Sequence, residues 1–395
     1  MVVTAEGYLA IAYALSGPAA WALVVFTGLK GRKRLAIRPT PVPALDAPPA
    51  VSLIIPCRNE EAGIEACVRS ALGQDYPNQQ TIVVDDRSDD ATGRLVDELA
   101  AADVRLLALH VRPGETPAGW FGKPFALTRG VKEATGEWLV FVDSDCTLAP
   151  NTVREAIATG VTRGFDLVSF VPRFIGTRFW DKLLTPLAGM ATSGMYSIIW
   201  ANARDRPQTA FACGQFIAVR RDAYEKIGGH AALRASAGED VLMAKKLKAA
   251  GGSPRLGWGM DLVTTRMYGT LGSVFTGWGR NFIAASAGKP WRVLAAIGFL
   301  LCCTFTVWPA LIAGFNNDQN FDAGVWLTLA GLHLTLVTFA IVDAYRWGRA
   351  DWRYALLWPI GLVVLLAIFV RSLYLCACRR VVWRGVTYEL SKAQA

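Results

Sequence analysis

Apolar stretches of about bilayer length lie near both ends of the chain, and they constrain its fold more than any other feature. Residues 8–29 form one such run, and three more lie at 293–314, 325–343 and 354–376. A helix needs about 20 apolar residues to cross a bilayer. With 53% hydrophobic and only 18% charged residues, the chain is also more apolar than ordinary soluble enzymes. The sequence therefore predicts an integral membrane protein with a more polar middle part.

Charges beside the first run predict how the chain is oriented. The run 8–29 is followed by the basic residues Lys30, Arg32, Lys33 and Arg34. A cleaved signal peptide carries positive charge before its apolar core, so residues 1–34 are expected to stay as a membrane anchor. The positive-inside rule then places the domain that follows in the cytoplasm, which in a bacterium means at the inner membrane. Residues 35–50, rich in Pro and Ala, are predicted to be a linker.

The C-terminal runs leave one conflict with that rule. Membrane helices are predicted over 286–378, and a basic tail follows at 379–395. The loop 344–353 is basic, which suits the inner face, whereas the loop 315–324 contains Asp and no Lys or Arg, which suits the outer face. Three full spans would nevertheless place the basic tail outside. Either one run is re-entrant or interfacial, or the tail breaks the rule.

The middle part, residues 51–285, predicts an α/β domain. Short apolar runs rich in β-branched residues occur at 51–56, 81–86, 138–143 and 166–171. Strands that alternate with helices predict a Rossmann-like, mostly parallel sheet with flanking helices. Such sheets bind ligands at the carboxyl ends of their strands, so functional residues are expected after Pro56, Asp86 and Asp143. The interrupted apolar stretch 183–200 is either an interfacial helix or a core helix.

Four motifs occur at the expected places and in a meaningful order. They are Ile55-Pro56-Cys57-Arg58-Asn59-Glu60-Glu61, Val84-Asp85-Asp86-Arg87-Ser88, Asp143-Ser144-Asp145 and Gly238-Glu239-Asp240. Each motif alone is a weak signal, since an acidic pair after a strand is often just a helix N-cap. Together they make the chain resemble family 2 inverting glycosyltransferases, which share the GT-A fold. The trailing apolar runs and the stretch from Trp383 to Tyr388 look like the lipid-glycosylating branch, which includes ceramide glucosyltransferases and hopanoid- and carotenoid-associated enzymes.

The resemblance implies a binding site for a UDP-sugar. Asp86 would read the uracil ring with Asp85 beside it, and the backbone from Pro56 to Arg58 would line the base. Asp85 is equally well explained as a structural cap. Lys123, in Gly122-Lys123-Pro124-Phe125-Ala126-Leu127, would meet the phosphates as a point charge, unless it is an ordinary surface lysine.

The Asp143-Ser144-Asp145 motif predicts a metal site next to the diphosphate. Alternate residues leaving a strand can point two carboxylates toward one point, and hard oxygen ligands suit Mg²⁺ or Mn²⁺. By resemblance, Asp145 is the firmer metal contact, with Asp143 beside it and Ser144 counted with the nucleotide-sugar site. The alternative is a solvated acidic turn.

Inverting transfer needs a base that removes the proton of the acceptor hydroxyl. By resemblance Asp240 is this base, and Glu239 is its neighbour on the acceptor side. The alternative is a carboxylate placed in the first turn of a helix because the helix dipole favours it. Gly214 and Gln215 lie in a stretch that resembles the acceptor-side loop of the family, with a strand bulge as the alternative.

The chain departs from the family pattern near the second apolar region. Many members carry Q-x-x-R-W there, whereas this chain has Gly277-Trp278-Gly279-Arg280-Asn281. Arg280 is kept and is expected to contact the diphosphate. Trp278 would stack on the sugar or the acceptor, or anchor the chain at the membrane interface. The departure argues against a processive polysaccharide synthase and looks like the variant in carotenoid-type enzymes.

These observations predict a metal-dependent hexosyltransferase with a membrane lipid hydroxyl as acceptor. Transfer to a polyprenyl phosphate and a non-catalytic membrane scaffold stay open as alternatives. Nucleic acid is not an expected partner, because the basic residues cluster beside apolar runs and no nucleic-acid-binding motif occurs. The donor sugar, the lipid and the oligomeric state are left open by the sequence.

Overall fold

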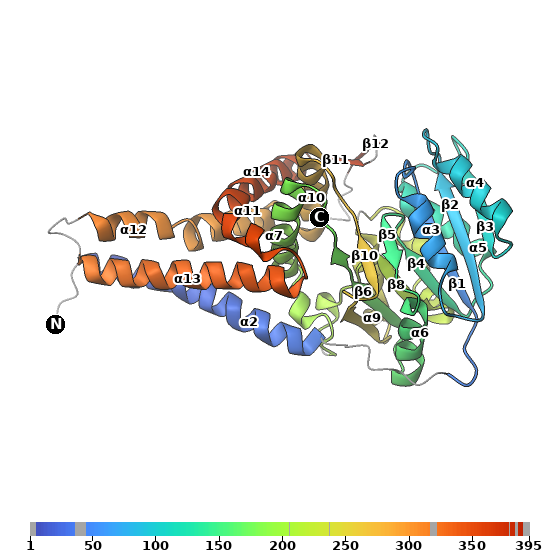
Figure 1. The fold of residues 1–395 in the computed structure, drawn as a ribbon, viewed down its shortest axis with the longest axis horizontal. Coiled ribbons are helices and arrows are strands. Elements are labelled where there is room, and N and C mark those ends of the chain that lie inside the picture. The colour runs from blue at the N-terminus through green and yellow to red at the C-terminus, as the bar shows by residue number, and fades with distance from the viewer. Residues whose placement is uncertain are drawn as a thin grey trace. The chain divides into compact units, whose positions relative to one another are not determined.

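The computed structural model describes residues 5–35, 45–204, 206–236, 238–316, 322–378, 380–383 and 386–389. They form two compact units (Figure 1). The helical unit comprises Met1–Lys33, Gly176–Ile199 and Tyr268–Ala395, and the α/β unit comprises Arg34–Ile175 and Trp200–Met267. Residues 36–44 of the predicted linker and residues 379, 384–385 and 390–395 of the predicted tail lie outside the described residues.

A seven-stranded sheet forms the centre of the α/β unit, with the strand order β3-β2-β1-β4-β8-β6-β9. The strands are β1 (Val51–Cys57), β2 (Gln79–Asp86), β3 (Leu106–Val111), β4 (Trp138–Val142), β6 (Leu167–Val171), β8 (Phe216–Arg220) and β9 (Pro254–Trp258). Neighbours pair in parallel except β8, which is antiparallel to both β4 and β6. The predicted mostly parallel sheet is confirmed.

Helices cover both faces of this sheet because its central strands are apolar on both sides. They are α3 (Ile64–Leu72), α4 (Thr92–Ala102), α5 (Gly122–Glu133), α6 (Thr152–Arg163), α8 (Arg221–Lys226) and α9 (Glu239–Ala249). Leu53 and Ile55 of β1 belong to the core under α3, α4 and α6. Ile54, between them, belongs to the opposite core under α5 and α9. This alternation is the period of two expected of a strand.

A small second sheet continues from the end of β4. It contains β5 (Cys146–Leu148), β10 (Val263–Thr265) and β7 (Arg173–Phe174), in the order β5-β10-β7. Since β5 begins directly after Asp145, the Asp143–Asp145 segment is fixed at both ends by strands. The 3₁₀ turns η3 (Pro207–Thr209) and η4 (His230–Leu233) complete the unit.

The helical unit contains the apolar runs. Its helices are α1 (Ala5–Ala14), a π-helical turn η1 (Leu15–Ala19), α2 (Ala20–Leu35), α7 (Phe179–Met195), α10 (Leu271–Ala285), α11 (Pro290–Cys303), α12 (Val307–Phe315), α13 (Ala323–Trp347), η5 (Trp352–Leu357) and α14 (Trp358–Ala377), while η2 (Ile198–Trp200) lies where the chain passes to the α/β unit. Within the described part of the chain, four helical segments are long and apolar enough to cross a membrane: Ala5–Arg32, Pro290–Phe315, Ala323–Trp347 and Trp352–Ala377. The four predicted apolar helices are therefore confirmed.

Two features of the helical unit were not expected from the sequence. Residues 176–199 and 268–285, grouped with the α/β domain on sequence, cluster here with the membrane helices. The predicted tail contains a two-stranded antiparallel ladder, β11 (Arg380–Trp383) with β12 (Val386–Glu389).

Candidate active site

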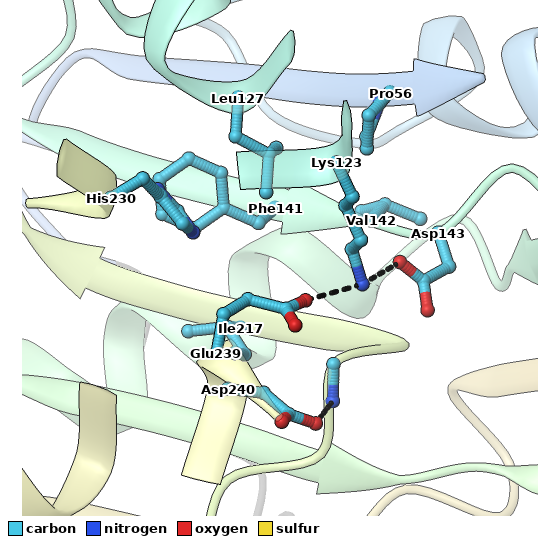
Figure 2. Close-up of a pocket in the computed structure, with 11 residues that line it drawn as sticks. Pro56, Lys123, Leu127, Phe141, Val142, Asp143, Ile217, His230, Glu239 and Asp240 are labelled. Carbon is cyan, nitrogen blue, oxygen red and sulfur yellow. Dashed lines mark hydrogen bonds and ion pairs between the residues drawn. The ribbon is translucent and has the colours of Figure 1, made fainter. Parts of the chain in front are cut away.

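A pocket opens at the carboxyl ends of β1 and β4, where ligands of parallel sheets bind (Figure 2). Its lining consists of Pro56, Lys123, Leu127, Phe141, Val142, Asp143, Gly214, Ile217, His230, Glu239 and Asp240. Six of these are residues that the sequence predicted for the site: Pro56, Lys123, Asp143, Gly214, Glu239 and Asp240. Pro56 and Asp240, which are far apart in the sequence, therefore meet in one place.

Lys123 lies at the centre of this pocket, in the first turn of α5. Its Nζ atom is 2.6 Å from Asp143 Oδ1 and 2.9 Å from Glu239 Oε1, as Figure 2 shows. Burial alone would lower the pKa of Lys123, but the carboxylates of Asp143, Glu239 and Asp240 outweigh it and hold that pKa well above its ordinary value. The side chain is only 18% exposed, so Lys123 is not a surface lysine.

Asp240 occupies the first turn of α9, beside Glu239. Its Oδ2 atom accepts a hydrogen bond of 2.9 Å from the Gly214 backbone N–H. Burial, reinforced by the negative charge of Glu239, raises the pKa of Asp240 to about 7, although Lys123 opposes the shift. A carboxyl group with a pKa near neutrality is well matched to accepting a proton during catalysis.

The pKa of Glu239 is shifted in the direction opposite to that of Asp240. Burial would raise its pKa, but the ion pair with Lys123 outweighs burial and lowers the pKa of Glu239. Two adjacent carboxylates thus have different proton affinities because only one of them is paired with the lysine. Such divergence is typical of carboxylates with distinct roles.

Asp145 is the second acidic residue of the Asp143–Asp145 segment. Its described hydrogen-bond donor is the Cys146 thiol, at 3.4 Å from Oδ1. Burial, together with the charges of Asp143 and Glu60, raises the pKa of Asp145 to about 7. A divalent cation would relieve this repulsion between three carboxylates.

Asp145 and Asp143 fit a metal ion whose remaining ligands come from the substrate and from water. Among the residues described, no group of three or more His, Cys, Asp or Glu side chains is arranged to hold a metal ion. Mg²⁺ and Mn²⁺ are commonly held by one or two carboxylates, with substrate phosphates and water as the other ligands. Asp145 and Asp143 match that pattern.

The two aspartates at the end of β2 have different partners. Asp86 is buried and pairs with Arg87, whose Nε atom is 2.8 Å from Oδ1. A Cβ atom on Gly122 would overlap Asp86 Oδ2, so only glycine lets α5 begin against this carboxylate. Asp85 contacts His110 Nδ1 at 3.2 Å and accepts a bond from the Ser88 backbone N–H. These bonds match the structural alternative for Asp85.

Other predicted residues take separate places. Ser144 is buried beside the acidic segment, and Arg58 lies directly after β1. Gln215 accepts hydrogen bonds from the Cys213 thiol through its side chain and from the Asp143 N–H through its backbone.

Trp278 and Arg280 belong to α10 of the helical unit. Trp278 is 3% exposed and packs on Tyr268 and Phe282. It is therefore not an exposed interfacial anchor.

Sequence reasoning assigned no role to Glu60, Gly122 or His110. Glu60 and Gly122 stand inside motifs quoted for other residues, so their presence there was the available signal. His110 carries no such signal, because its contact with Asp85 comes from the pairing of β2 with β3. His230 lines the pocket, but it bonds the Tyr224 hydroxyl at 2.9 Å, and burial lowers its pKa to about 3. These contacts favour a structural role for His230.

Comparison with known proteins identifies the catalytic class. The sequence model of glycosyl transferase family 2 matches residues 52–228, which carry β1 to β8 and most of the pocket. Residues 52–228 therefore carry a glycosyltransferase domain of the family 2 type. A relative from Staphylococcus aureus (strain USA300), 4,4'-diaponeurosporenoate glycosyltransferase, is 26% identical over 353 residues, which cover 87% of this chain and 90% of the relative.

The GT-A fold expected for this family is confirmed by a solved structure. A mannosyltransferase from Pyrobaculum calidifontis, in complex with GDP-Man and Mn²⁺, superposes with a TM-score of 0.50 at 20% sequence identity. The match covers 93% of this chain and 98% of the mannosyltransferase. It therefore extends beyond the α/β unit into the helical regions.

A side chain at position 214 is expected to disturb the placement of Asp240 and Lys123. A Cβ atom there would lie 3.0 Å from Asp240 Oδ2 and 3.3 Å from Lys123 Nζ, so Gly214→Ala must displace one of them. We expect a loss of roughly 10-fold or more in turnover, since small misplacements of reacting groups are costly. The measurement is the rate of sugar transfer with the nucleotide affinity determined in parallel. Gly189→Ala, where a Cβ would meet nothing within 4 Å, is the matched control and should keep the full rate.

Proposed function

We propose that this glycosyltransferase moves a hexose from a UDP-sugar to a hydroxyl group of a membrane lipid, with inversion at the anomeric carbon and with the help of Mg²⁺ or Mn²⁺. The catalytic unit faces the cytoplasm in this proposal. The observation that carries it is the convergence of Asp240, Glu239, Lys123 and Asp143 on one pocket at the carboxyl ends of parallel strands.

The part of the pocket around Lys123 and Asp143 is suited to bind the negatively charged diphosphate of the sugar donor. Lys123 is a buried cation between two carboxylates, and it can shift toward a diphosphate that enters beside Asp143. A divalent cation on Asp145 and Asp143 would supply Lewis-acid stabilisation of the departing diphosphate. Asp86, held against the start of α5, is placed at a strand end where its carboxylate can accept the N–H of a uracil ring.

Asp240 performs the proton transfer in this scheme. As the acceptor oxygen forms its bond to the anomeric carbon, the bond from that carbon to the diphosphate oxygen breaks, and the hydroxyl proton passes to Asp240. Its raised pKa makes it a stronger base than an exposed aspartate. The Gly214 N–H orients the carboxylate by binding Oδ2.

A lipid acceptor is supported by two independent observations. Four helical segments are long and apolar enough to cross a membrane, which supports membrane association and therefore access to a lipid acceptor. The S. aureus relative is named for a carotenoid substrate, 4,4'-diaponeurosporenoate. That name also favours a second candidate, transfer to a lipid carboxylate, because it denotes the anion of a carboxylic acid.

The test is a nucleotide-release assay on the full-length protein in detergent. The donors are UDP-glucose, UDP-galactose, UDP-N-acetylglucosamine and GDP-mannose, each with Mn²⁺ or EDTA and with or without a total lipid extract. We expect UDP release that needs both metal and lipid, and mass spectrometry of the product will identify the acceptor. Release only from GDP-mannose would contradict the UDP assignment, and lipid-independent release would contradict the lipid acceptor.

A further inference from the structure

We propose that the chain crosses the bilayer three times, and that α14 is a re-entrant helix. After the α/β unit the chain forms α10, and α11 then enters the bilayer from one membrane face. In this proposal α14 starts inside the bilayer and ends at that same face. The C-terminal ladder of β11 and β12 then lies on the catalytic face. All contacts used for this inference lie within the helical unit.

The contact between the end of α11 and the middle of α13 provides a depth scale. His333 Nε2 of α13 lies 3.0 Å from the carbonyl oxygen of Cys303 at the end of α11. Pro290, where α11 begins, is 13 residues before Cys303, and Trp347, where α13 ends, is 14 residues after His333. Both helical stretches measure about 20 Å. The start of α11 and the end of α13 are therefore at the same face.

The C-terminal end of α14 lies at that face. The Cys376 thiol is 3.7 Å from the Ser286 hydroxyl, and Ser372 Oγ donates a 3.0 Å bond to the Gly279 carbonyl. Gly279 belongs to α10, and Ser286 caps it four residues before α11 begins. A helix that crossed the membrane after α13 would instead end beside the α12–α13 connection.

The N-terminal end of α14 lies part of the way into the bilayer. Trp358 Nε1 donates a 3.2 Å hydrogen bond to Thr338 Oγ1, and the Trp358 ring stacks on Trp308. Thr338 is nine residues before Trp347, or about 14 Å along α13. That depth is about half of the roughly 30 Å hydrocarbon core. In Figure 1, α14 lies with α7, α10 and α11, and it does not accompany α12 and α13 along their length.

The segment that connects α13 to α14 is also suited to lipid. The 3₁₀ turn η5 exposes large apolar side chains, namely Trp352, Leu356 and Leu357. The outer face of α14 continues this surface with Ile360, Val363, Val370 and Tyr374. Burying such side chains in hydrocarbon stabilises them, whereas a loop in water would leave them exposed at a cost of about 25 cal/mol per Å².

This topology removes the conflict between the basic tail and the positive-inside rule. With α14 re-entrant, one face carries the basic residues that flank the membrane helices, namely Arg32, Lys289, Arg292, Arg346, Arg349 and Arg353, together with the basic tail from residue 379 onward. The opposite face receives the α12–α13 connection, which contains Asp and no Lys or Arg. A face with that charge fits anionic lipid headgroups.

Cys378 is a native probe for this topology. It caps α14 and is exposed, and Cys302 is the other exposed cysteine among the residues described. In a Cys302→Ser background, we would label sealed membrane vesicles with an impermeant maleimide before and after adding detergent. Val104→Cys, in the fully exposed α4–β3 turn, marks the catalytic face, and Asn316→Cys, after α12, marks the other face; both carry Cys378→Ser.

We expect Cys378 to label from the same side as Val104→Cys and to lose that label in Cys378→Ser. Asn316→Cys should label from that side only after detergent. Labelling of Cys378 from the side of Asn316→Cys would overturn the proposal, since it would mean a fourth crossing. Thr387→Cys, in β12, provides a second probe on the C-terminal ladder, and the same two outcomes apply to it. Equal rates of nucleotide release by all variants would show that labelling reports on folded enzyme.

Discussion

Asp240→Asn is expected to lower the rate of sugar transfer to a lipid hydroxyl by roughly 10²–10⁴-fold, the contribution usual for a general base. The amide keeps the size of the side chain and can still accept the Gly214 N–H bond, so the pocket should keep its shape. Binding of the nucleotide-sugar should therefore change little. Single-turnover transfer and donor titration, measured on the same preparation, separate the two effects.

The pH dependence of the wild-type enzyme provides an independent check. The pKa of Asp240 is raised to about 7, so its basic form predominates only above neutrality, and transfer should decline as the pH falls below 7. Glu239→Gln is the matched variant, because it removes the adjacent charge that helps raise this pKa. Its acidic limb should move to lower pH, whereas a merely structural role for Asp240 would leave the limb in place.

The Asp240→Asn variant also distinguishes a lipid hydroxyl acceptor from a lipid carboxylate acceptor. A lipid carboxylate is ionised at neutral pH and attacks without losing a proton, so it needs no base. If the Asp240→Asn enzyme retains transfer and the acidic limb near pH 7 is absent, the hydroxyl acceptor is wrong and the carboxylate candidate is favoured. Loss of donor binding in this variant would contradict the role of Asp240 altogether, because nothing in the proposal makes it a donor ligand.

The fold could be predicted where the signal is local. β1, β2, β4 and β6 are short β-branched runs, and their burial on both faces produces the pattern of a parallel sheet. β8 was not predicted, because its place between β4 and β6 depends on pairing between residues about 50 to 80 positions apart. The membrane helices were predictable by length, but the depth of α14 was not, since it depends on contacts such as Trp358 with Thr338.

The candidate site, like the fold, could be predicted from the sequence only in part. The motif order predicted which aspartates lie at strand ends, because strand ends of one sheet are neighbours. It did not predict that Lys123 would bridge Asp143 and Glu239, a contact that joins α5, the end of β4 and α9. Nor did it predict that Glu60 would approach Asp145 closely enough to raise its pKa. Pairwise electrostatics of this kind needs the tertiary structure.

Asp145→Asn is expected to reduce transfer by roughly 10³-fold and to weaken its dependence on Mn²⁺, since a metal contributes several kcal/mol to charge stabilisation. The variant replaces a carboxylate with an amide of nearly the same shape. The rate of transfer as a function of Mn²⁺ concentration measures both effects. Calorimetry of Mn²⁺ binding in the presence of UDP measures the affinity of the metal site without turnover. An unchanged Mn²⁺ dependence would exclude Asp145 as a ligand.

Protein stability gives a readout that does not depend on activity. The pKa of Asp145 is raised to about 7, so the metal-free folded protein binds this proton more tightly than the unfolded chain does. Its contribution to stability is present at low pH and is lost as the pH rises through 7. The Tm of the metal-free wild type should therefore fall between pH 5 and 7 more than that of Asp145→Asn. Mn²⁺ with UDP should restore the wild-type Tm at pH 8, because the cation replaces the proton between Asp145, Asp143 and Glu60, and it should restore the variant much less.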